Sequence, residues 1–293
     1  MTEGVIVKAL SGFYYVETGD GLLACKARGR FRLDGTSPLV GDRVRCSVDA
    51  QGCGRIDQVE ERKNWFIRPT VANIDALVFV AANSNPVTDP FLIDRVSVIA
   101  EEAGCELIIC LNKTDLDAGD VLYRIFTKAG FPVIRTSAET GEGIEALRDA
   151  LRGKISAFTG NSGVGKSSLL NCLLPGLNIP TAEVSEKLGR GKHTTRHTEL
   201  FRLEEGSYVA DTPGFASFEI EMMQHIPKEN LPFDFRDFAP YIGKCRFQDC
   251  SHRKEPDCAV TQAVRNGEIS ESRYASYLRL YELCAQHKEW EYK

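Results

Sequence analysis

The order of two short motifs constrains the fold of this chain more than any other feature. A glycine-rich stretch, GNSGVGKSS, spans residues 160–168 and fits the pattern G-x-x-x-x-G-K-[ST] at every fixed position. A second stretch, LNKTD, lies earlier in the chain, at residues 111–115. Where both occur in an ordinary nucleotide-binding domain, the glycine-rich loop comes first. Either one motif is a coincidence, or the chain has been cut and rejoined elsewhere.

The glycine-rich stretch has the chemistry of a phosphate-binding loop. It follows a predicted strand, KISAFTG, and opens a predicted helix, which is the context that such a loop requires. Glycines let the backbone wrap around phosphates, so that N–H groups point inward at the helix N-terminus. We expect Lys166 to reach the β- and γ-phosphates and Ser167 to bind Mg²⁺. The predicted loop consists of Gly160, Asn161, Ser162, Gly163, Val164, Gly165, Lys166, Ser167 and Ser168.

A third motif, DTPG at residues 211–214, ends the predicted strand YVAD. Alone it is an ordinary turn. After a phosphate loop and a buried strand, Asp211 is placed to supply a second carboxylate for Mg²⁺, and Gly214 to offer a backbone N–H to the γ-phosphate.

The LNKTD stretch contains the residue types that distinguish guanine from adenine. Asp115 can accept hydrogen bonds from the ring N–H and the exocyclic amino group of guanine, which adenine lacks, so a buried carboxylate would reject adenine. Asn112 can reach the other edge of the base, the stem of Lys113 can cover its face, and Thr114 completes the motif. Four letters can also be a chance turn. Ser137 and Ala138 add weight, because they end the next predicted strand and the Ala138 N–H could meet the guanine carbonyl oxygen.

The region that holds these motifs alternates between strands and helices. Apolar runs at 74–83 and 105–112 read as strands buried on both faces, with helical stretches at 90–104, 119–130 and 143–152 between or after them. This alternation predicts a parallel, doubly wound sheet whose strand tips share one edge. A binding site at that edge does not depend on chain order, so we predict a circularly permuted nucleotide-binding domain.

The N-terminal region reads as a small β domain. Five short segments at 4–10, 13–18, 21–29, 42–49 and 54–62 are separated by glycine- and aspartate-rich turns, which favours an OB-fold barrel over another five-stranded β domain. Basic residues alternate along the end of the third segment and the residues just after it. They lie in the stretch CKARGRFR, residues 25–32, and if this stretch is a strand, one face carries Lys26, Arg28, Arg30 and Arg32, which is either an RNA-binding face or a solvated one.

Three cysteines and a histidine near the C-terminus have the spacing of a metal site. Cys245, Cys250, His252 and Cys258 form the pattern C-x4-C-x-H-x5-C, and four such ligands suit one tetrahedral, structural zinc ion. Unrelated cysteines are the alternative. The other seven cysteines are scattered, as expected of reduced thiols in a cytosolic protein.

A basic, glycine-rich stretch between the phosphate loop and DTPG should hold a threonine that binds Mg²⁺. Thr194 and Thr195 are the candidates, and we favour Thr195. Phe215 stands where a water-positioning glutamine is expected. His193 could orient the attacking water instead, or it could simply face solvent or RNA.

The composition is that of an ordinary water-soluble protein. Charged residues make up 26% of the chain, and the formal net charge of −5 argues against a uniformly basic nucleic-acid binder. No run of 18 apolar residues and no signal peptide are apparent, so we expect a cytoplasmic protein with no membrane partner. Nothing indicates an obligate oligomer, and we expect a monomer.

Taken together, the order NKTD, SA, GNSGVGKSS, GRGKHTTR, DTPG and C-x4-C-x-H-x5-C resembles the ribosome small-subunit-dependent GTPase A family. The resemblance covers essentially the whole chain. It implies an OB-fold over 1–68, a permuted GTPase domain over 69–220 and a helical zinc domain over 221–293. It also implies GTP and GDP with Mg²⁺, one Zn²⁺, and the small ribosomal subunit and its rRNA as partner. The motif residues above, including His193, match the family's pattern.

Three functions are compatible with the residues. The first is a GTPase that acts late in small-subunit maturation and is stimulated by that subunit. The second is an RNA-binding assembly factor for which GTP is a conformational ligand. The third, an ATP-dependent enzyme, leaves the NKTD and SA motifs without a role.

Overall fold

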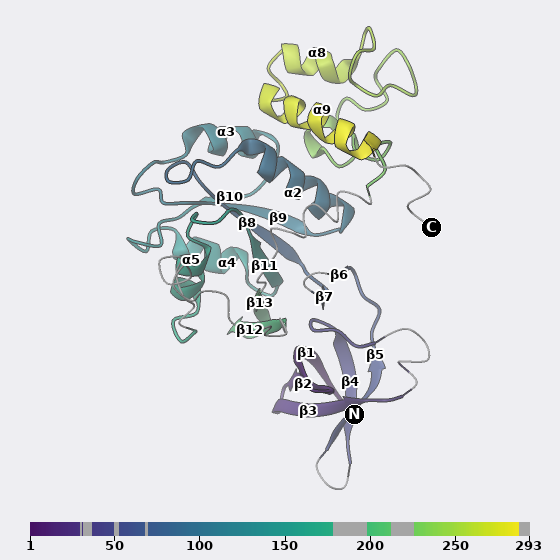
Figure 1. Cartoon of the computed structure of the whole chain (residues 1–293), viewed down its shortest axis with the longest axis vertical. Helices are drawn as coiled ribbons and strands as arrows, with labels where there is room; N and C mark the ends of the chain where they lie inside the picture. Colours follow the sequence, from purple (N-terminus) through teal and green to yellow (C-terminus); the bar gives the residue numbers. More distant parts are fainter. Residues whose placement is uncertain are drawn as a thin grey trace. The chain divides into compact units, whose positions relative to one another are not determined.

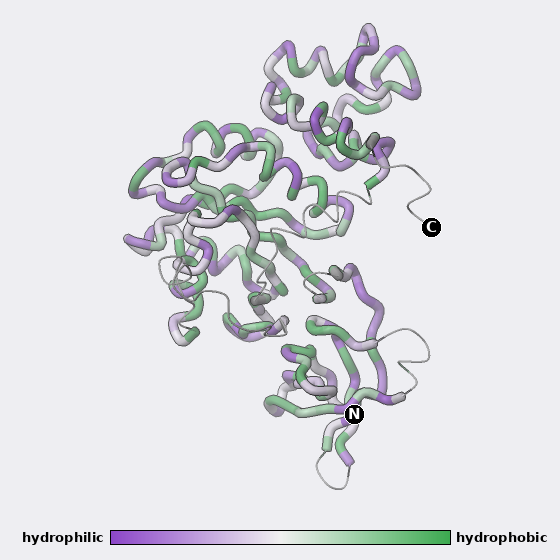
Figure 2. Tube along the Cα trace, viewed as in Figure 1, coloured by the Kyte–Doolittle hydropathy of each residue, from purple (hydrophilic) through white to green (hydrophobic). Residues whose placement is uncertain are grey.

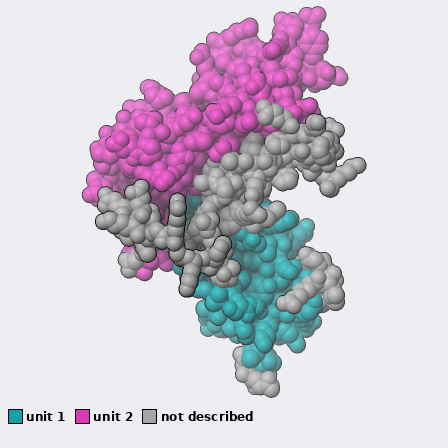
Figure 3. All heavy atoms as spheres, in the orientation of Figure 1, with its two compact units in different colours: residues 1–76, 151–158, 187–215 teal, residues 77–150, 159–186, 216–293 magenta. Residues whose placement is uncertain are grey.

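The computed structural model describes residues 1–29, 31, 37–49, 53–67, 70–177, 198–211 and 226–286. It forms two compact units (Figure 3). The first consists of Met1–Ala76, Leu151–Phe158 and Lys187–Phe215, and the second of Leu77–Ala150, Thr159–Glu186 and Ala216–Lys293. Each unit is built from segments that lie apart in the sequence.

The N-terminal part of the first unit is a five-stranded barrel, as predicted (Figure 1). Its strands are β1 (Thr2–Leu10), β2 (Phe13–Thr18), β3 (Gly21–Ala27), β4 (Arg43–Val48) and β5 (Gly54–Val59). The strand order is β1-β2-β3-β5-β4, and a further pairing of β1 with β4 closes the sheet. Only the β3–β5 pair is parallel.

Alternation along the barrel strands directs every second side chain inward. The interior contains side chains that are at most 1% exposed: Ile6, Val16, Cys25, Val44, Cys46 and Ile56. The thiols of Cys25 and Cys46 lie 3.7 Å apart in this core, where they pack as small apolar groups.

The first unit also contains strands that the sequence reading did not foresee. β11 (Ile155–Thr159) pairs in parallel with β13 (Ser207–Asp211), as expected, but β12 (Glu199–Glu204) forms an antiparallel hairpin with β13. β12 also pairs with the barrel strand β1 at Lys8 and Glu199, whose side chains form an ion pair at 2.9 Å. A second hairpin joins β6 (Trp65–Ile67) and β7 (Thr70–Ala72). The sheet is therefore not purely parallel.

The second unit contains the predicted alternation of strands and helices. Its elements are β8 (Ala76–Ala82), α2 (Pro90–Glu102), β9 (Glu106–Asn112), α3 (Asp120–Lys128), β10 (Val133–Arg135), α4 (Ile144–Ala150) and α5 (Lys166–Leu173). The strand order is β10-β9-β8, and β10 pairs in parallel with β9. All seven residues of β8 are buried, and they form a continuous hydrophobic stretch in Figure 2.

The C-terminal region, 226–286, completes the second unit. It contains η1 (Arg236–Phe238), α8 (Ala259–Arg265) and α9 (Glu271–Gln286). Phe235, Phe238 and Tyr277 form an aromatic core with ring centroids 5.0–5.4 Å apart. α9 is attached to α2 by the fully buried Arg273, whose guanidinium bonds Asp94 at 2.7 Å and Asp237 at 2.6 Å.

Among the helices within the described ranges, none is long and apolar enough to cross a membrane.

Candidate functional site

The phosphate loop connects β11 to α5, and two of its glycines are required by close approaches. Gly160 has φ +131°, and a Cβ there would lie 2.2 Å from the carbonyl oxygen of Val80. Gly165 has φ +94°, and a Cβ there would lie 2.3 Å from Nδ2 of Asn112. No side chain fits at either position, which explains both fixed glycines of the motif.

Lys166 lies over this loop at the start of α5. Its Nζ donates to the carbonyl oxygens of Gly160 and Asn161, each at 2.6 Å. The ammonium group is therefore held against the backbone of the loop that is predicted to bind phosphates.

Asn112 joins three segments that are far apart in the sequence. It ends β9 and is 2% exposed. Its Nδ2 donates to the Val164 carbonyl in the phosphate loop at 2.9 Å, while its Oδ1 accepts from the Ala138 N–H at 3.1 Å. The NKTD motif, the Ser137–Ala138 pair and the phosphate loop thus meet at one side chain, although Asn112 and Val164 are 52 positions apart in the sequence.

The two predicted base-reading loops are also bonded to each other. Ser137 donates from Oγ to Oδ1 of Asp115 at 2.6 Å, which orients the carboxylate. Thr114 donates from Oγ1 to the Thr136 carbonyl at 2.9 Å. These bonds fix the side of the loop that carries Asp115.

Thr136 is a residue that the sequence analysis missed. It is fully buried, and its Oγ1 lies 3.3 Å from Oδ1 of Asn112 and 3.2 Å from Sγ of Cys110. The sequence does contain one signal for Thr136, namely a hydroxyl residue directly before Ser137 and Ala138. The Thr136 hydroxyl, which donates to Oδ1 of Asn112, therefore helps to fix the orientation of the Asn112 side chain.

A cavity of about 350 Å³ opens between these loops. Its size lies at the lower end of the range for small-molecule sites, roughly 300–1,000 Å³. It is lined by Asn112, Lys113, Asp115, Leu116, Ala138, Glu139, Gly165 and Ser168. The cavity therefore joins the base-reading motif to the end of the phosphate loop and the first turn of α5, as a site for a nucleotide requires.

Asp211 belongs to the first unit, and several other predicted site residues fall outside the described residues. Asp211 ends β13, next to the strand that leads into the phosphate loop, with Ala157 opposite Ala210. His193, Thr194, Thr195, Gly214 and Phe215 fall outside the described ranges.

The predicted basic strand is shorter than expected. β3 ends at Ala27, so Arg28 lies beyond it, and its guanidinium is paired with Asp57 at 2.6 Å. Lys26 lies over the ring of Phe13, 5.1 Å from its centroid. Arg30 and Arg32 lie outside the described residues. The expectation of basic side chains alternating along one strand face fails at Arg28, because β3 ends at Ala27.

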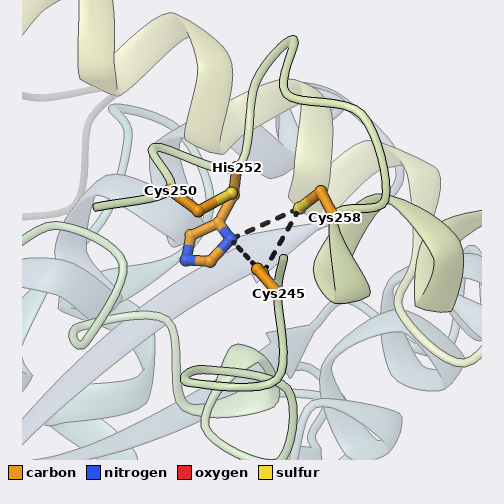
Figure 4. A group of neighbouring side chains, drawn as sticks. All are labelled: Cys245, Cys250, His252 and Cys258. Atoms are coloured by element: carbon orange, nitrogen blue, oxygen red, sulfur yellow. Dashed lines mark hydrogen bonds between the residues drawn. The ribbon is translucent and has the colours of Figure 1, made fainter. Parts of the chain in front are cut away.

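The C-terminal cysteines and histidine converge on one point (Figure 4). The ligand atoms of Cys245, Cys250, His252 and Cys258 all lie within 4.8 Å of one another. Nδ1 of His252 is 3.5 Å from Sγ of Cys245 and 3.4 Å from Sγ of Cys258, and these two sulfurs are 3.9 Å apart.

These separations fit a tetrahedral metal ion. With metal–sulfur bonds of about 2.3 Å and metal–nitrogen bonds of about 2.0–2.1 Å, ligand atoms should lie about 3.8 Å apart for two sulfurs and about 3.5 Å apart for sulfur and nitrogen. Burial raises the pKa of the Cys250 thiol to about 12. A bound cation would offset this cost and hold the thiolate, so the donor set suggests a metal site, with zinc as the matching ion.

The chain around this cluster is fixed by its own hydrogen bonds. Tyr274 and Tyr277 of α9 donate from their hydroxyls to the carbonyl oxygens of His252 at 3.0 Å and Ser251 at 2.6 Å. Glu255 accepts from Ser251, from the Arg253 N–H and from neighbouring backbone. Although burial opposes it, these bonds hold the pKa of Glu255 at about 2.

Comparison with known proteins identifies the family. The family model "RsgA GTPase" matches residues 59–221, and "RsgA N-terminal domain" matches residues 3–56. The chain is 45% identical to the small ribosomal subunit biogenesis GTPase RsgA of Caldanaerobacter subterraneus subsp. tengcongensis, covering 99% of this chain and 98% of the relative. Its identity to the protein of the same name from Thermotoga maritima is 44%, with 98% of each chain covered.

Two solved structures share the fold over nearly the whole length. YjeQ from Thermotoga maritima superposes with a TM-score of 0.84 at 39% identity, covering 98% of this chain and 99% of that one. YloQ, described as a circularly permuted GTPase, gives a TM-score of 0.83 at 35% identity, with 98% and 96% covered. On the strength of the family model, the full-length relatives and the shared fold, this chain belongs to the RsgA family of circularly permuted GTPases.

Proposed function

We propose that this protein hydrolyses GTP to GDP and phosphate and acts late in the maturation of the small ribosomal subunit, which stimulates the hydrolysis. The observation that carries the nucleotide assignment is the pair of bonds from Asn112 to Val164 and from Ala138 to Asn112. These bonds join a base-reading loop to a phosphate loop. The names of the relatives support the ribosomal role.

In this proposal, Asp115 pairs with the ring N–H and amino group of guanine, and Ser137 keeps that carboxylate oriented. Because a carboxylate is acceptor-only, it finds two donors on guanine and none in that geometry on adenine. Ala138 offers its N–H to the guanine carbonyl after a small rearrangement from Asn112.

The phosphate end would be held by the loop and by Mg²⁺. Lys166 would exchange its two loop carbonyls for the β- and γ-phosphates, and Ser167, Thr195 and Asp211 would hold the Mg²⁺ ion, which would neutralise phosphate charge. His193 orients the attacking water, because Phe215 has no hydrogen-bonding group to do so.

One structural zinc ion would complete the C-terminal region. Three thiolates and one imidazole fill a tetrahedral shell and leave no position for a substrate. The rRNA of the small subunit would meet the barrel, where Lys26 over Phe13 combines a cation with an exposed ring. In this proposal the protein acts in the cytoplasm as a monomer. Its three domains meet near residues 68 and 220.

A second function is supported by one feature of the sequence. Phe215 in place of a glutamine favours weak intrinsic hydrolysis. In that case GTP serves mainly as the ligand that switches an RNA-binding assembly factor, and hydrolysis is secondary.

Steady-state GTP turnover separates the two functions. The purified protein is assayed alone and with small subunits, large subunits or naked rRNA, with Lys166→Ala as the inactive control. We expect a large increase with small subunits only, and none with the variant. Equal slow turnover in all mixtures would leave a guanine-nucleotide-binding assembly factor.

A further inference from the structure

The loop that connects β8 to α2, residues 83–89, contacts both halves of the nucleotide site. We propose that this β8–α2 loop is a positioning element for guanine-nucleotide binding, in which the carbonyl of Asn85 holds the ammonium group of Lys113. The inference rests on the proposed function, since it concerns the same site.

The β8–α2 loop is a compact turn at the end of β8. Asn83 and Val87 form an antiparallel bridge across it. At its base, Thr88 donates its N–H to the Ala82 carbonyl at 2.8 Å and accepts from the Ala82 N–H through Oγ1 at 3.0 Å. A loop closed in this way presents its tip in a defined position.

The tip of the loop contacts the base-reading motif. Nζ of Lys113 donates to the carbonyl oxygen of Asn85. Lys113 lies in the left-handed backbone region, with φ +64°, and its own carbonyl accepts from the N–H of Leu116 and Asp117. With its backbone fixed by that turn and its ammonium fixed by Asn85, the lysine stem is held at both ends along the wall of the cavity. An aliphatic stem held there offers a flat surface for a purine ring.

A second contact lies two residues beyond the motif, at Asp117. Asp117 accepts from the Gly119 N–H at 2.8 Å. This bond, together with one to the Asn83 side chain, lowers the pKa of Asp117. The β8–α2 loop therefore touches the base-reading segment before and after Asp115.

A third contact reaches the phosphate loop. A Cβ built on Gly163 would lie 3.4 Å from Cδ of Pro86, so the proline ring packs directly against this glycine. One short segment thus borders the loops that would hold the base and the phosphates. A displacement of its tip would alter the spacing of both.

A matched pair of substitutions at Asn85 tests the proposal. Asn85 has φ +37°, a conformation that glycine adopts freely and that a β-branched residue resists. Asn85→Gly keeps the carbonyl in place, whereas Asn85→Val displaces it. We expect Asn85→Val to weaken GDP binding about tenfold, as for the loss of one hydrogen bond to a charged group. Asn85→Gly should stay within about twofold of the wild type, because it adopts this backbone conformation freely.

A double-mutant cycle shows whether the effect passes through Lys113. Lys113→Met removes the ammonium group and keeps most of the stem. In this background Asn85→Val should cause a much smaller loss of GDP affinity, because only the contact of Pro86 with Gly163 then remains to transmit the displacement. An equal loss in both backgrounds would overturn the proposal, because the loop would then act by general destabilisation. Equal affinity of Asn85→Val and the wild type would also overturn it.

A second variant keeps the test available if Asn85→Val does not fold. Asn83→Asp places a carboxylate beside Asp117, and the repulsion should weaken GDP binding at low salt and less at high salt. An affinity that is independent of salt and equal to that of the wild type would contradict the proposal. Failure of the wild type itself to bind GDP would instead refute the proposed function.

Discussion

The nucleotide site and the C-terminal region belong to the same compact unit, yet different forces hold them. Around the site, the bonds that join distant segments are mostly neutral and involve Asn112, Thr136, Ala138 and Val164. The C-terminal region depends on charges and on a thiol cluster. Arg273 is fully buried between Asp94 and Asp237, and four potential metal ligands surround one point.

This difference determines what each region responds to. Neutral hydrogen bonds change little with pH, salt or metal. Buried charges are costly unless each is paired, and a cluster of thiolates requires a cation. We therefore expect the C-terminal region to respond to metal and pH under conditions that leave the nucleotide site intact.

Loss of the metal should have the largest effect. Cys250→Ser removes one of four ligands, and structural zinc contributes on the order of 10 kcal/mol to the folding of small domains. We expect loss of bound zinc and rapid hydrogen exchange over 245–286, while guanine-nucleotide binding persists. Cys53→Ser, at an exposed cysteine, is the control. Unchanged protection of α8 and α9 in zinc-free protein would show that the cluster does not hold this region.

Breaking the buried ion pairs should have the next largest effect. Arg273→Met leaves two buried carboxylates without their partner and should cost about 3–5 kcal/mol of unfolding free energy. Denaturant unfolding measures this loss. Combining Arg273→Met with Asp94→Asn and Asp237→Asn removes the uncompensated charge and should recover part of the stability. No recovery in the triple variant would mean that packing of Arg273, not its charge, matters.

A substitution in the nucleotide site should change nucleotide affinity and selectivity, and leave the stability of the protein unchanged. Asp115→Asn replaces a carboxylate, which only accepts hydrogen bonds, with an amide that both donates and accepts and therefore suits xanthine. The change should weaken GDP binding by about 1.5–3 kcal/mol, the range for a hydrogen bond to a charged group. Competition by GDP and xanthosine diphosphate measures the change in preference, and zinc content and melting temperature should stay constant. Unaltered selectivity would remove Asp115 from the base-reading role.

Stability should also depend on pH, through Asp234. Burial, with the nearby Glu102 and Glu101, raises the pKa of Asp234 to about 8, and its Oδ2 has no hydrogen-bond partner among the residues that the structure describes. An unfolded aspartate titrates at about 3.9, so the folded chain retains a proton that the unfolded chain has lost, and this contribution to stability falls as pH rises from about 4 to about 8.

Asp234→Asn removes this titration. We expect the variant to melt above the wild type at pH 8, where each increase of about 1 kcal/mol in stability shifts the melting temperature by roughly 2–4 °C in a chain of this size. The difference should shrink at pH 5. A constant difference at both values would point to packing instead of protonation.

Much of the fold was predictable because its signals are local. Turn residues separate the five barrel strands, fixed glycines mark the phosphate loop, and C-x4-C-x-H-x5-C spaces the ligand set within fourteen residues. The meeting of the strand-tip motifs follows from the shared edge of a parallel sheet.

Features that depend on long-range contacts were not predictable. The antiparallel strand β12 is tied to β1 through Glu199 and Lys8, and nothing near either residue signals the other. The bond from Lys113 to the Asn85 carbonyl uses a backbone atom, which every residue has. Arg273 reads as a surface residue until α9 packs on α2.

Competition between GDP and ADP for the purified protein tests the central claim most directly, namely that a permuted chain assembles a guanine site from Asn112, Asp115, Ala138 and the phosphate loop. A labelled GDP is bound at equilibrium and displaced with unlabelled GDP or ADP in the presence of Mg²⁺. The account predicts full displacement by GDP and no displacement by a hundredfold excess of ADP, about 2.7 kcal/mol or more of discrimination. Equal displacement by both would contradict it, because the base-reading motif would then have no role.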